Sequence, residues 1–313
     1  GPGGGSSTGI VLQGRSYVTI KNLKINLFGY GIYLRANSIS NIILGNNMAN
    51  SGVDTWLSSS SYNTITENTM TGSWNQSIIL SSSSSNNVIR ANKIENSTAY
   101  GSGLYYYSNY NSISGNNITS NVYRGICIYS CTNNNMFGNR IKTNGGSAGE
   151  GVYLYNSTNN SVYHNNLINN GPPQVTTLYS PWNIWDDGYP SGGNYWSDYK
   201  GTDLLSGPYQ NETGCDKIGD TPYIINADNR DRYPFMNPWT PPQHDIAVVS
   251  VNPSKTVVGQ GFALFINVTV ENQGISAETF NVTAYAATIP PGTTVNETRV
   301  LSLLPGEVGT VSF

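Results

Sequence analysis

Apolar and polar residues alternate in short phrases that recur along the first half of the chain. One phrase reads Asn, any, apolar, any, any, Asn, any, apolar, as in residues 111–118 (NSISGNNI), and it begins at residues 41, 63, 87, 111, 134 and 160. A second phrase, such as GIYL at residues 31–34, recurs beside it. Alternation with a period of two is typical of a half-buried strand, and repetition at a nearly fixed interval is typical of a solenoid. The pattern predicts a parallel β-helix.

The phrases also predict which side chains fill the solenoid. In GIYL we expect Ile32 and Leu34 to point inward and Tyr33 to point outward, because successive side chains of a strand alternate between its faces. In NSISGNNI the inward pair is Ile113 and Ile118. The repeated Asn residues mark bends, where they tolerate left-handed backbone angles and can bond to their copies in the neighbouring coils. We therefore interpret these Asn residues as architectural.

Composition divides the chain into three parts. Residues 1–181 are predicted to form the β-helix, with about seven coils. Residues 182–242 are rich in Asp, Trp, Pro and Gly and are predicted to form a cap and a linker. Residues 243–313 contain longer alternating strands, which favour an immunoglobulin-like β-sandwich that is incomplete at its C-terminus. Its closing strands belong either to a continuation of the chain or to a neighbouring molecule.

The fold class is thus all-β, a right-handed parallel β-helix solenoid followed by an immunoglobulin-like sandwich. The repeats, together with GGNYWSDYKGTD (192–203) and CDKIGDTPYIINADNRDRYPFMNP (215–238), resemble the NosD-like right-handed β-helix proteins of archaeal and bacterial surfaces over residues 9–240. The segment 244–313 resembles part of a CARDB domain, an immunoglobulin-like module associated with cell adhesion. The resemblance implies an archaeal or bacterial envelope protein. The copper role implied by the family name lacks a ligand-like cluster, because the His, Met and Cys residues are scattered.

Charge and hydropathy limit the kinds of partner that the chain is expected to bind. Only 11% of the 313 residues are charged and the net charge is -3, which gives no basis for nucleic-acid binding. No apolar run is long enough to predict a membrane span. No signal peptide is visible, and we expect a mature or trimmed piece of a longer extracellular, cell-surface or secreted protein.

Asparagine and cysteine residues offer candidate modification sites. The predicted N-linked glycosylation sites are Asn75, Asn96, Asn117, Asn156, Asn159, Asn211, Asn267, Asn281 and Asn296. Cys127 and Cys131 are near enough in sequence to form a disulfide if the chain turns between them, and the alternative is that they are unpaired. Because the chain has three Cys residues, such a disulfide would leave Cys215 without a partner in the same chain.

Acidic residues are the candidate metal and catalytic groups. Asp216, Asp220, Asp228 and Asp231 form a possible calcium site, and the alternative is that they solvate and initiate turns. Arg140–Lys142 and the pair Asp186–Asp187 superficially resemble the groups of pectin hydrolases, but their order is reversed. The β-helix itself has only four carboxylates, spread over different coils, whereas glycoside hydrolysis needs two close together. The sequence therefore predicts that the chain is not an enzyme.

Outward tyrosines are the remaining candidates for a site. Tyr33, Tyr105 and Tyr153 are predicted to occupy the same position of the GIYL-type phrase. Such a column can bind sugar rings or form a protein interface, or it can be ordinary cross-strand stacking.

Together these features favour an extracellular, glycosylated structural or adhesive protein that self-associates into a surface layer (S-layer) or filament. The alternative is an envelope carbohydrate-binding protein that uses the tyrosines and has glycans as partners. A polysaccharide lyase or hydrolase is the weaker alternative. No cofactor is predicted beyond the possible calcium and the N-linked glycans.

Overall fold

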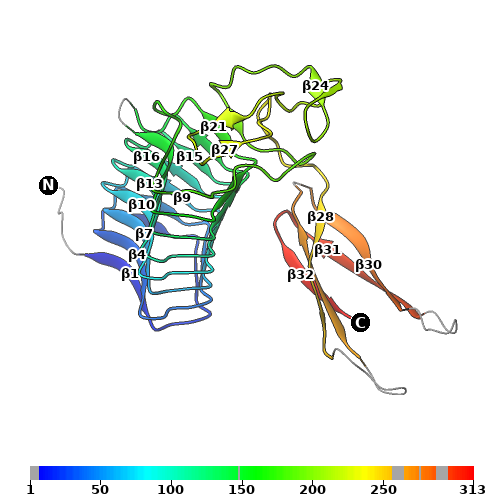
Figure 1. The fold of residues 1–313 in the computed structure, drawn as a ribbon. Coiled ribbons are helices and arrows are strands. Elements are labelled where there is room, and N and C mark those ends of the chain that lie inside the picture. Colours follow the sequence, from blue (N-terminus) through cyan, green and yellow to red (C-terminus); the bar gives the residue numbers. More distant parts are fainter. Residues whose placement is uncertain (1–6, 147–148, 256–263, 275, 287–294) are drawn as a thin grey trace. The chain divides into compact units, whose positions relative to one another are not determined.

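The computed structural model describes residues 7–146, 149–255, 264–274, 276–286 and 295–313. The chain divides into two compact units, Gly1–Trp239 and Thr240–Phe313, which are described separately (Figure 1).

The first unit is a parallel β-helix with three sheets. Sheet A contains the longest strands: β1 (Thr8–Gln13), β4 (Tyr30–Arg35), β7 (Val53–Ser58), β10 (Gln76–Ser81), β13 (Tyr100–Tyr105), β16 (Arg124–Tyr129), β19 (Glu150–Tyr155) and β22 (Val175–Leu178). Sheet B contains β2 (Thr19–Lys21), β5 (Ile42–Leu44), β8 (Thr64–Thr66), β11 (Val88–Arg90), β14 (Ser112–Ser114), β17 (Asn135–Phe137) and β20 (Ser161–Tyr163). Sheet C contains β3 (Lys24–Asn26), β6 (Asn47–Ala49), β9 (Thr69–Thr71), β12 (Lys93–Glu95), β15 (Asn117–Thr119), β18 (Arg140–Lys142), β21 (Asn166–Ile168) and β23 (Tyr195–Trp196). The predicted solenoid of about seven coils is confirmed, since sheet B has seven strands, one in each coil.

The core is the column of inward side chains predicted from the phrases. Ile32, Leu34, Ile113 and Ile118 are fully buried, whereas Tyr33 is only half-buried. Each coil places two or more such apolar side chains on those of its neighbours, so a single core runs along the unit.

Two columns of buried asparagines run along the bends of the solenoid, and a shorter third column joins Asn121, Asn144 and Asn170. In one column each side-chain amide donates to the Oδ1 atom of the next Asn at 2.9 to 3.0 Å. Its members are Asn46, Asn68, Asn92, Asn116, Asn139, Asn165 and Asn194. The second column runs through Asn41, Asn63, Asn87, Asn111, Asn134, Asn160 and Asn183. The architectural interpretation of these residues is confirmed.

The cap closes the last coil. It contains the short hairpins β24 (Leu205–Ser206) with β25 (Glu212–Thr213), and β26 (Tyr223–Ile224) with β27 (Arg230–Asp231). Trp185 and Trp196 are each 1% exposed and cover the end of the apolar core. The ring of Tyr223 stacks on Trp196, with a centroid distance of 4.0 Å. A cap is needed here because an open coil would expose apolar side chains and unpaired strand edges.

The second unit consists of small antiparallel sheets. One sheet contains β28 (Ile246–Pro253), β29 (Ile266–Asn272) and β32 (Val308–Ser312), and the other contains β30 (Glu278–Ala286) and β31 (Val295–Leu303). Val268, Val270 and Leu303 form its buried core. These sheets are compatible with an immunoglobulin-like sandwich, but the sandwich and the CARDB domain stay predictions.

The residues that the structure describes include no helix with the length and apolar character required to cross a bilayer.

Candidate functional site

The outward side of sheet A carries a concentration of aromatic side chains. We call it the tyrosine face and define it by the aromatic residues Tyr30, Tyr33, Trp56, Tyr100, Tyr105, Tyr129, Tyr153 and Tyr155, with Gln76, Arg124 and Glu150 among them. Six of the aromatic residues project outward because they alternate along their strands with the buried residues of the core: Tyr33, Trp56, Tyr105, Tyr129, Tyr153 and Tyr155. The others, Tyr30, Gln76, Tyr100, Arg124 and Glu150, occupy the first position of their strands.

The sequence predicts that Tyr33, Tyr105 and Tyr153 share one column of sheet A, and this is wrong for Tyr105. Tyr33 pairs with Trp56, and Tyr153 pairs with Cys127 in the same column of the sheet. Tyr105 instead pairs with Tyr129, two residues further along the strand.

The register follows from the position of glycine in coil 5. A Cβ atom added to Gly101 would lie 2.7 Å from the carbonyl oxygen of Gly125, so coil 5 leaves no room for a side chain there, although Asp54 and Ser77 occupy the same column in coils 3 and 4. The predicted position of Tyr105 follows from matching GLYY at residues 103–106 with GIYL, which would put Gly103 in this column instead. Gly103 has a different role, because an added Cβ would lie 2.4 Å from the ring of Tyr105. Its missing side chain leaves room for that ring.

One aromatic cluster lies at the N-terminal end of the tyrosine face. The rings of Tyr33 and Trp56 stack with a centroid distance of 4.8 Å and an interplanar angle of 20°. Tyr30 packs against Trp56 at 5.1 Å. Trp56 also donates through Nε1 to the Ser81 hydroxyl at 2.9 Å, which fixes the orientation of its ring.

A second cluster is organised by Arg124. Its guanidinium carbon lies 3.6 Å from the ring centroid of Tyr153 and 5.3 Å from that of Tyr100. Arg124 Nε donates to Glu150 Oε2 at 2.9 Å, and Nη1 donates to the Tyr100 hydroxyl at 3.2 Å. The cation is thus held between two rings and one carboxylate, an arrangement in which cation–π attraction is strengthened by partial burial.

Cys127 and Gln76 are buried polar residues of this cluster, and Tyr105 is half-buried beside them. The Tyr105 hydroxyl donates to Gln76 Oε1 at 3.0 Å, and burial raises the pKa of Tyr105 well above its ordinary value. Burial also raises the pKa of Cys127 to about 11, so its thiol is protonated at neutral pH. Alongside them, the Tyr129 and Tyr155 rings stack at 4.7 Å with an angle of 10°. The tyrosine face therefore offers ring faces and hydrogen-bonding groups in fixed positions.

Of the two alternatives for Cys127 and Cys131, a disulfide or two unpaired thiols, the structure has the unpaired thiols. Both thiols are free and buried. Cys127 belongs to an outward column of sheet A, whereas Cys131 lies in the following bend, where its backbone N–H donates to the Ser157 hydroxyl. Cys215 is exposed and also free.

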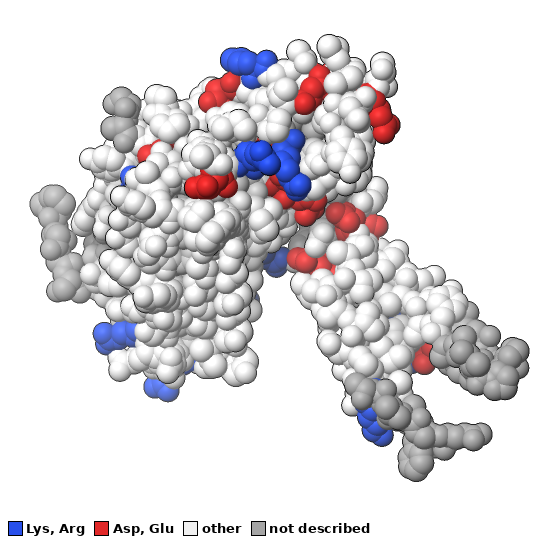
Figure 2. All heavy atoms as spheres, in the orientation of Figure 1, with Lys and Arg blue, Asp and Glu red and all other residues white. Residues whose placement is uncertain are grey.

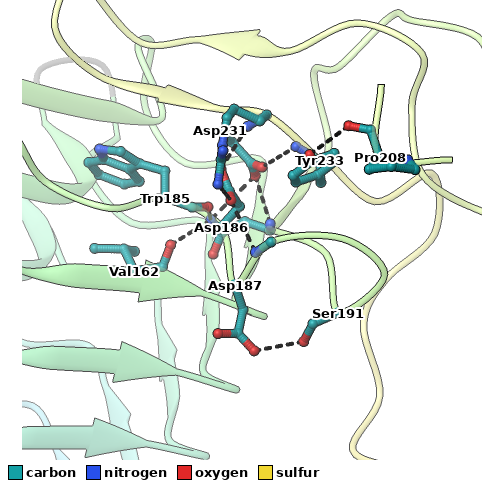
Figure 3. Close-up of polar contacts among 11 residues, drawn as sticks. Val162, Trp185, Asp186, Asp187, Ser191, Pro208, Asp231 and Tyr233 are labelled. Atoms are coloured by element: carbon teal, nitrogen blue, oxygen red, sulfur yellow. Dashed lines mark hydrogen bonds and ion pairs between the residues drawn. The ribbon is translucent and has the colours of Figure 1, made fainter. Parts of the chain in front are cut away.

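The acidic groups of the cap have structural partners (Figure 3). Asp231 accepts hydrogen bonds from the Asn194 backbone N–H at 2.7 Å, from Trp196 Nε1 at 2.8 Å and from the Tyr233 backbone N–H at 3.0 Å. Burial raises the pKa of Asp231 to about 7, and these hydrogen bonds act in the opposite direction. Asp186 is paired with Arg232 at 2.6 Å. Both carboxylates therefore attach the cap to the last coil.

The four aspartates of the predicted calcium site are not brought together. Asp231 is buried as described, Asp220 accepts from the backbone N–H groups of Leu204 and Leu205, and Asp216 accepts from Gln210 Nε2. In the described ranges no group of three or more His, Cys, Asp or Glu side chains is placed to hold a metal ion. Calcium binding stays a prediction, and the described residues do not form a set of ligands for it.

The residues compared with pectin hydrolases are also separated. In β18, Ile141 is buried in the core and Arg140 donates to Asn117 Oδ1. Asp187 is exposed and accepts from the Ser191 hydroxyl at 2.7 Å, whereas Asp186 is engaged by Arg232. His164 Nε2 is 2.9 Å from the Ser191 carbonyl oxygen, so this nitrogen carries the proton and does not accept one from the hydroxyl.

The predicted glycosylation sites differ in accessibility. Asn75, Asn96, Asn156, Asn159, Asn211, Asn267 and Asn281 are exposed. Asn117 is half-buried and bonded to Arg140. The side chain of Asn296 lies outside the described part of the chain.

Sequence reasoning missed the Arg124–Glu150 pair and the Asp186–Arg232 pair. A signal for the first was present, because Arg124 and Glu150 each stand two residues before the inward residue of their strand, in adjacent repeats. No comparable signal existed for the second, since the cap has no repeat.

The comparisons with known proteins bear on this arrangement. The family described as periplasmic copper-binding protein (NosD) matches residues 6–201, more than half of the chain. The chain belongs to the NosD family. The periplasmic description of the NosD family indicates an envelope or extracellular location. No curated protein sequence matches the chain.

The residues present do not fit a copper site of the kind that the NosD description implies. His164 stacks on Trp239 at 4.9 Å, and His244 is paired with Glu278 in the second unit. The three Cys residues are separate, and no cluster of metal ligands occurs among the residues that are described.

Several solved structures resemble the NosD-family chain. A double mutant of the periplasmic alginate epimerase AlgG is 26% identical, with a TM-score of 0.43, over 51% of this chain and 38% of that chain. The A-module of the Azotobacter vinelandii mannuronan C-5 epimerase AlgE4 is 15% identical, with a TM-score of 0.42, over 57% and 54%. The enzymatically active domain of bacteriophage CBA120 tailspike protein 2 is 14% identical, with a TM-score of 0.45, over 94% and 50%. The chain thus spans between about two fifths and about half of these proteins.

These comparisons contradict the prediction that the chain is not an enzyme. The solved structures that it resembles include epimerases and an enzymatically active tailspike domain. With TM-scores below 0.5, these likenesses assign no reaction or substrate to this chain.

Proposed function

We propose that this NosD-family protein binds a polysaccharide outside the cytoplasm through the tyrosine face of sheet A. The observation that carries the proposal is the Arg124 cluster, in which Tyr100 and Tyr153 hold a guanidinium beside Glu150 on a rigid sheet. Sugars pack their C–H faces on aromatic rings and exchange hydrogen bonds with polar groups at the ring edge.

Rigidity supports this function. The strands of sheet A are paired on both sides along most of the solenoid, and the asparagine columns hold successive coils in register. A binding surface whose side chains are already ordered loses little conformational entropy when a ligand docks. The tyrosine face extends over six coils, from β4 to β19, which suits a chain-like ligand better than a single sugar.

The charge distribution also fits. In Figure 2 the visible face of the solenoid is mostly uncharged, whereas acidic and basic side chains gather over the cap. Contacts with sheet A therefore depend on ring stacking and hydrogen bonding, with Arg35, Arg124 and Glu150 as local charges.

The test uses substitutions that the fold already accepts. Val11 and Thr176 occupy the positions equivalent to Tyr33 and Tyr153 in other coils, so Tyr33→Val and Tyr153→Thr should preserve the coil. We expect the double variant to lose roughly tenfold or more in affinity for a polysaccharide bound by the wild type in isothermal calorimetry. The matched control is Tyr209→Ser, an 84% exposed tyrosine of the cap. Equal affinity of the double variant and the wild type would refute the proposal.

A structural or adhesive role is the second candidate. Val248, Val249 and Val251 are more than half exposed on β28, one of the two edge strands of its sheet. Exposed apolar side chains on an unpaired edge favour association with another chain. This candidate predicts concentration-dependent assembly in sedimentation experiments, reduced by Val249→Lys. A sedimentation coefficient that does not change with concentration would exclude it.

A further inference from the structure

A second aromatic surface lies at the bend between sheet A and sheet B. We call it the A–B ridge and define it by Tyr17, Tyr62, Tyr106, Tyr107, Tyr110, Tyr179 and Trp182. These are seven of the nine exposed aromatic residues among the described residues of the first unit, the others being Tyr123 and Tyr209. All seven are more than half exposed, so the ridge is more accessible than the half-buried tyrosine face.

Four members of the ridge share one structural position. Tyr17, Tyr62, Tyr110 and Trp182 each stand two residues before the first paired residue of sheet B in their coil. The intervening coils carry Ser40, Asn86, Asn133 and Asn159 there. The backbone φ of all eight residues lies between 55° and 60°.

This left-handed conformation is unfavourable for bulky side chains. Asn tolerates it well, whereas an aromatic residue there is an outlier. The solenoid does not require aromatic residues at the position, because Asn86 and Asn133 serve in neighbouring coils. Strained residues that the fold does not need are typical of functional sites.

The spacing of the rings indicates the ligand. Tyr17, Tyr62 and Tyr110 occupy alternate coils, and two coils span roughly 10 Å at the usual distance between strands. A linear polysaccharide with an approximately two-fold twist, such as a β-1,4-linked glycan, turns the same face outward at every second sugar. The rings are separated by Ser40 and Asn86, whose hydroxyl and amide groups can bond sugar hydroxyls.

Charge narrows the ligand further. The eight segments that form this bend are 14–18, 36–41, 59–63, 82–87, 106–111, 130–134, 156–160 and 179–183, and Arg15 is their only charged residue. An acidic glycan would find no row of cations here. A protein partner is disfavoured at coils 1 and 3, where single rings are set among polar residues and form no continuous apolar patch.

We propose that the A–B ridge binds a neutral, linear polysaccharide that repeats every two sugars. This inference rests on the proposed carbohydrate-binding function and assigns it a second surface and a class of glycan. The predicted glycosylation sites Asn156 and Asn159 lie on the same bend, so a glycan there would cover part of the ridge.

The experiment uses the residue of the neighbouring coils as the replacement. The triple variant Tyr62→Asn, Tyr110→Asn, Trp182→Asn is produced in a host without N-glycosylation, and binding to hydroxyethyl cellulose, glucomannan, xylan, alginate and polygalacturonate is measured by affinity electrophoresis. We expect the wild type to bind at least one neutral polymer, with little change in about 0.5 M NaCl. The triple variant should bind that polymer roughly tenfold more weakly and unfold at no lower temperature.

The outcomes separate the two proposals. A loss of roughly tenfold or more in neutral-polymer binding by the triple variant supports the ridge, whether or not Tyr33→Val, Tyr153→Thr also binds more weakly. Unchanged binding in the triple variant, or a wild type that binds only acidic polymers, overturns the ridge and leaves the tyrosine face standing if its own variant loses binding. A wild type that binds none of the five polymers overturns the ridge inference and counts against the proposed function.

Discussion

Asp54 is a buried acid with no charged partner among the described residues of the solenoid. It lies in β7, is fully buried, and accepts a hydrogen bond from the Ser73 hydroxyl at 2.5 Å, while its Oδ1 atom has no partner. Ser73 is in turn bonded to Ser77. Burial raises the pKa of Asp54 to about 7, although the hydrogen bonds from Ser73 and Ser77 lower it. We predict that Asp54→Asn stabilises the protein at neutral pH.

The magnitude follows from linkage. The folded pKa of about 7 exceeds the ordinary value of 3.8 by about 3 units. Each unit corresponds to about 1.4 kcal/mol, so ionisation of Asp54 costs about 4 kcal/mol of unfolding free energy above pH 7. Below pH 3.8 the acid is protonated in both the folded and unfolded states and costs nothing. The destabilisation therefore grows as the pH rises from about 4 to about 7.

The assay is urea unfolding of the wild type and Asp54→Asn at intervals between pH 4 and pH 8. We expect similar stabilities at pH 4 and a variant that is more stable by up to about 4 kcal/mol at pH 8. Asp231 and the other titrating groups are common to both proteins, so the difference isolates Asp54. A difference that does not change with pH, or a variant less stable than the wild type at pH 8, would refute the reasoning.

Three further predictions concern the columns and the cap, each measured as the free energy of unfolding in urea. Asn116→Ala removes the acceptor of two N–H groups of the preceding coil and should cost about 2–4 kcal/mol, whereas the control Asn117→Ala should cost less than about 1 kcal/mol. Equal costs would contradict the role of the columns. Asp231→Ala leaves the Trp196 indole N–H without an acceptor and should lower the free energy of unfolding by about 3 kcal/mol. The tryptophan emission should also shift to the red. An unchanged spectrum and an unchanged stability would contradict this role of Asp231. Cys131→Ser should change stability by less than about 1 kcal/mol, because a serine holds the equivalent bend in the next coil, and a larger loss would show that the thiol has a specific role.

The repeats made the solenoid predictable from sequence. Ile113 and Ile118 were assigned to the core from alternation alone, because the physical cause of the pattern is the burial of every second side chain. The asparagine columns were predictable because each Asn recurs at one position of the repeat.

The site was harder to predict. Tyr105 was misplaced by two residues because GLYY aligns with GIYL by letters, whereas the structure places Gly101, and not Gly103, in the column of Gly31 and Gly125. Contacts across coils, such as Arg124 with Tyr153, depend on that register. The A–B ridge did leave a signal in the sequence: an aromatic residue stands directly before an Asn of the second column, in YN at 62–63 and WN at 182–183. This signal becomes informative only once the left-handed backbone conformation of the aromatic residue is known.

The most direct test of the account is calorimetric titration of the wild type and the variant Tyr33→Val, Tyr153→Thr with the same set of neutral and acidic polysaccharides. The account predicts saturable binding by the wild type and a loss of roughly tenfold or more in the variant, while both unfold at the same temperature. Binding that is identical in the two proteins, or a wild type that binds none of the polymers, would contradict the claim that the tyrosine face binds polysaccharide.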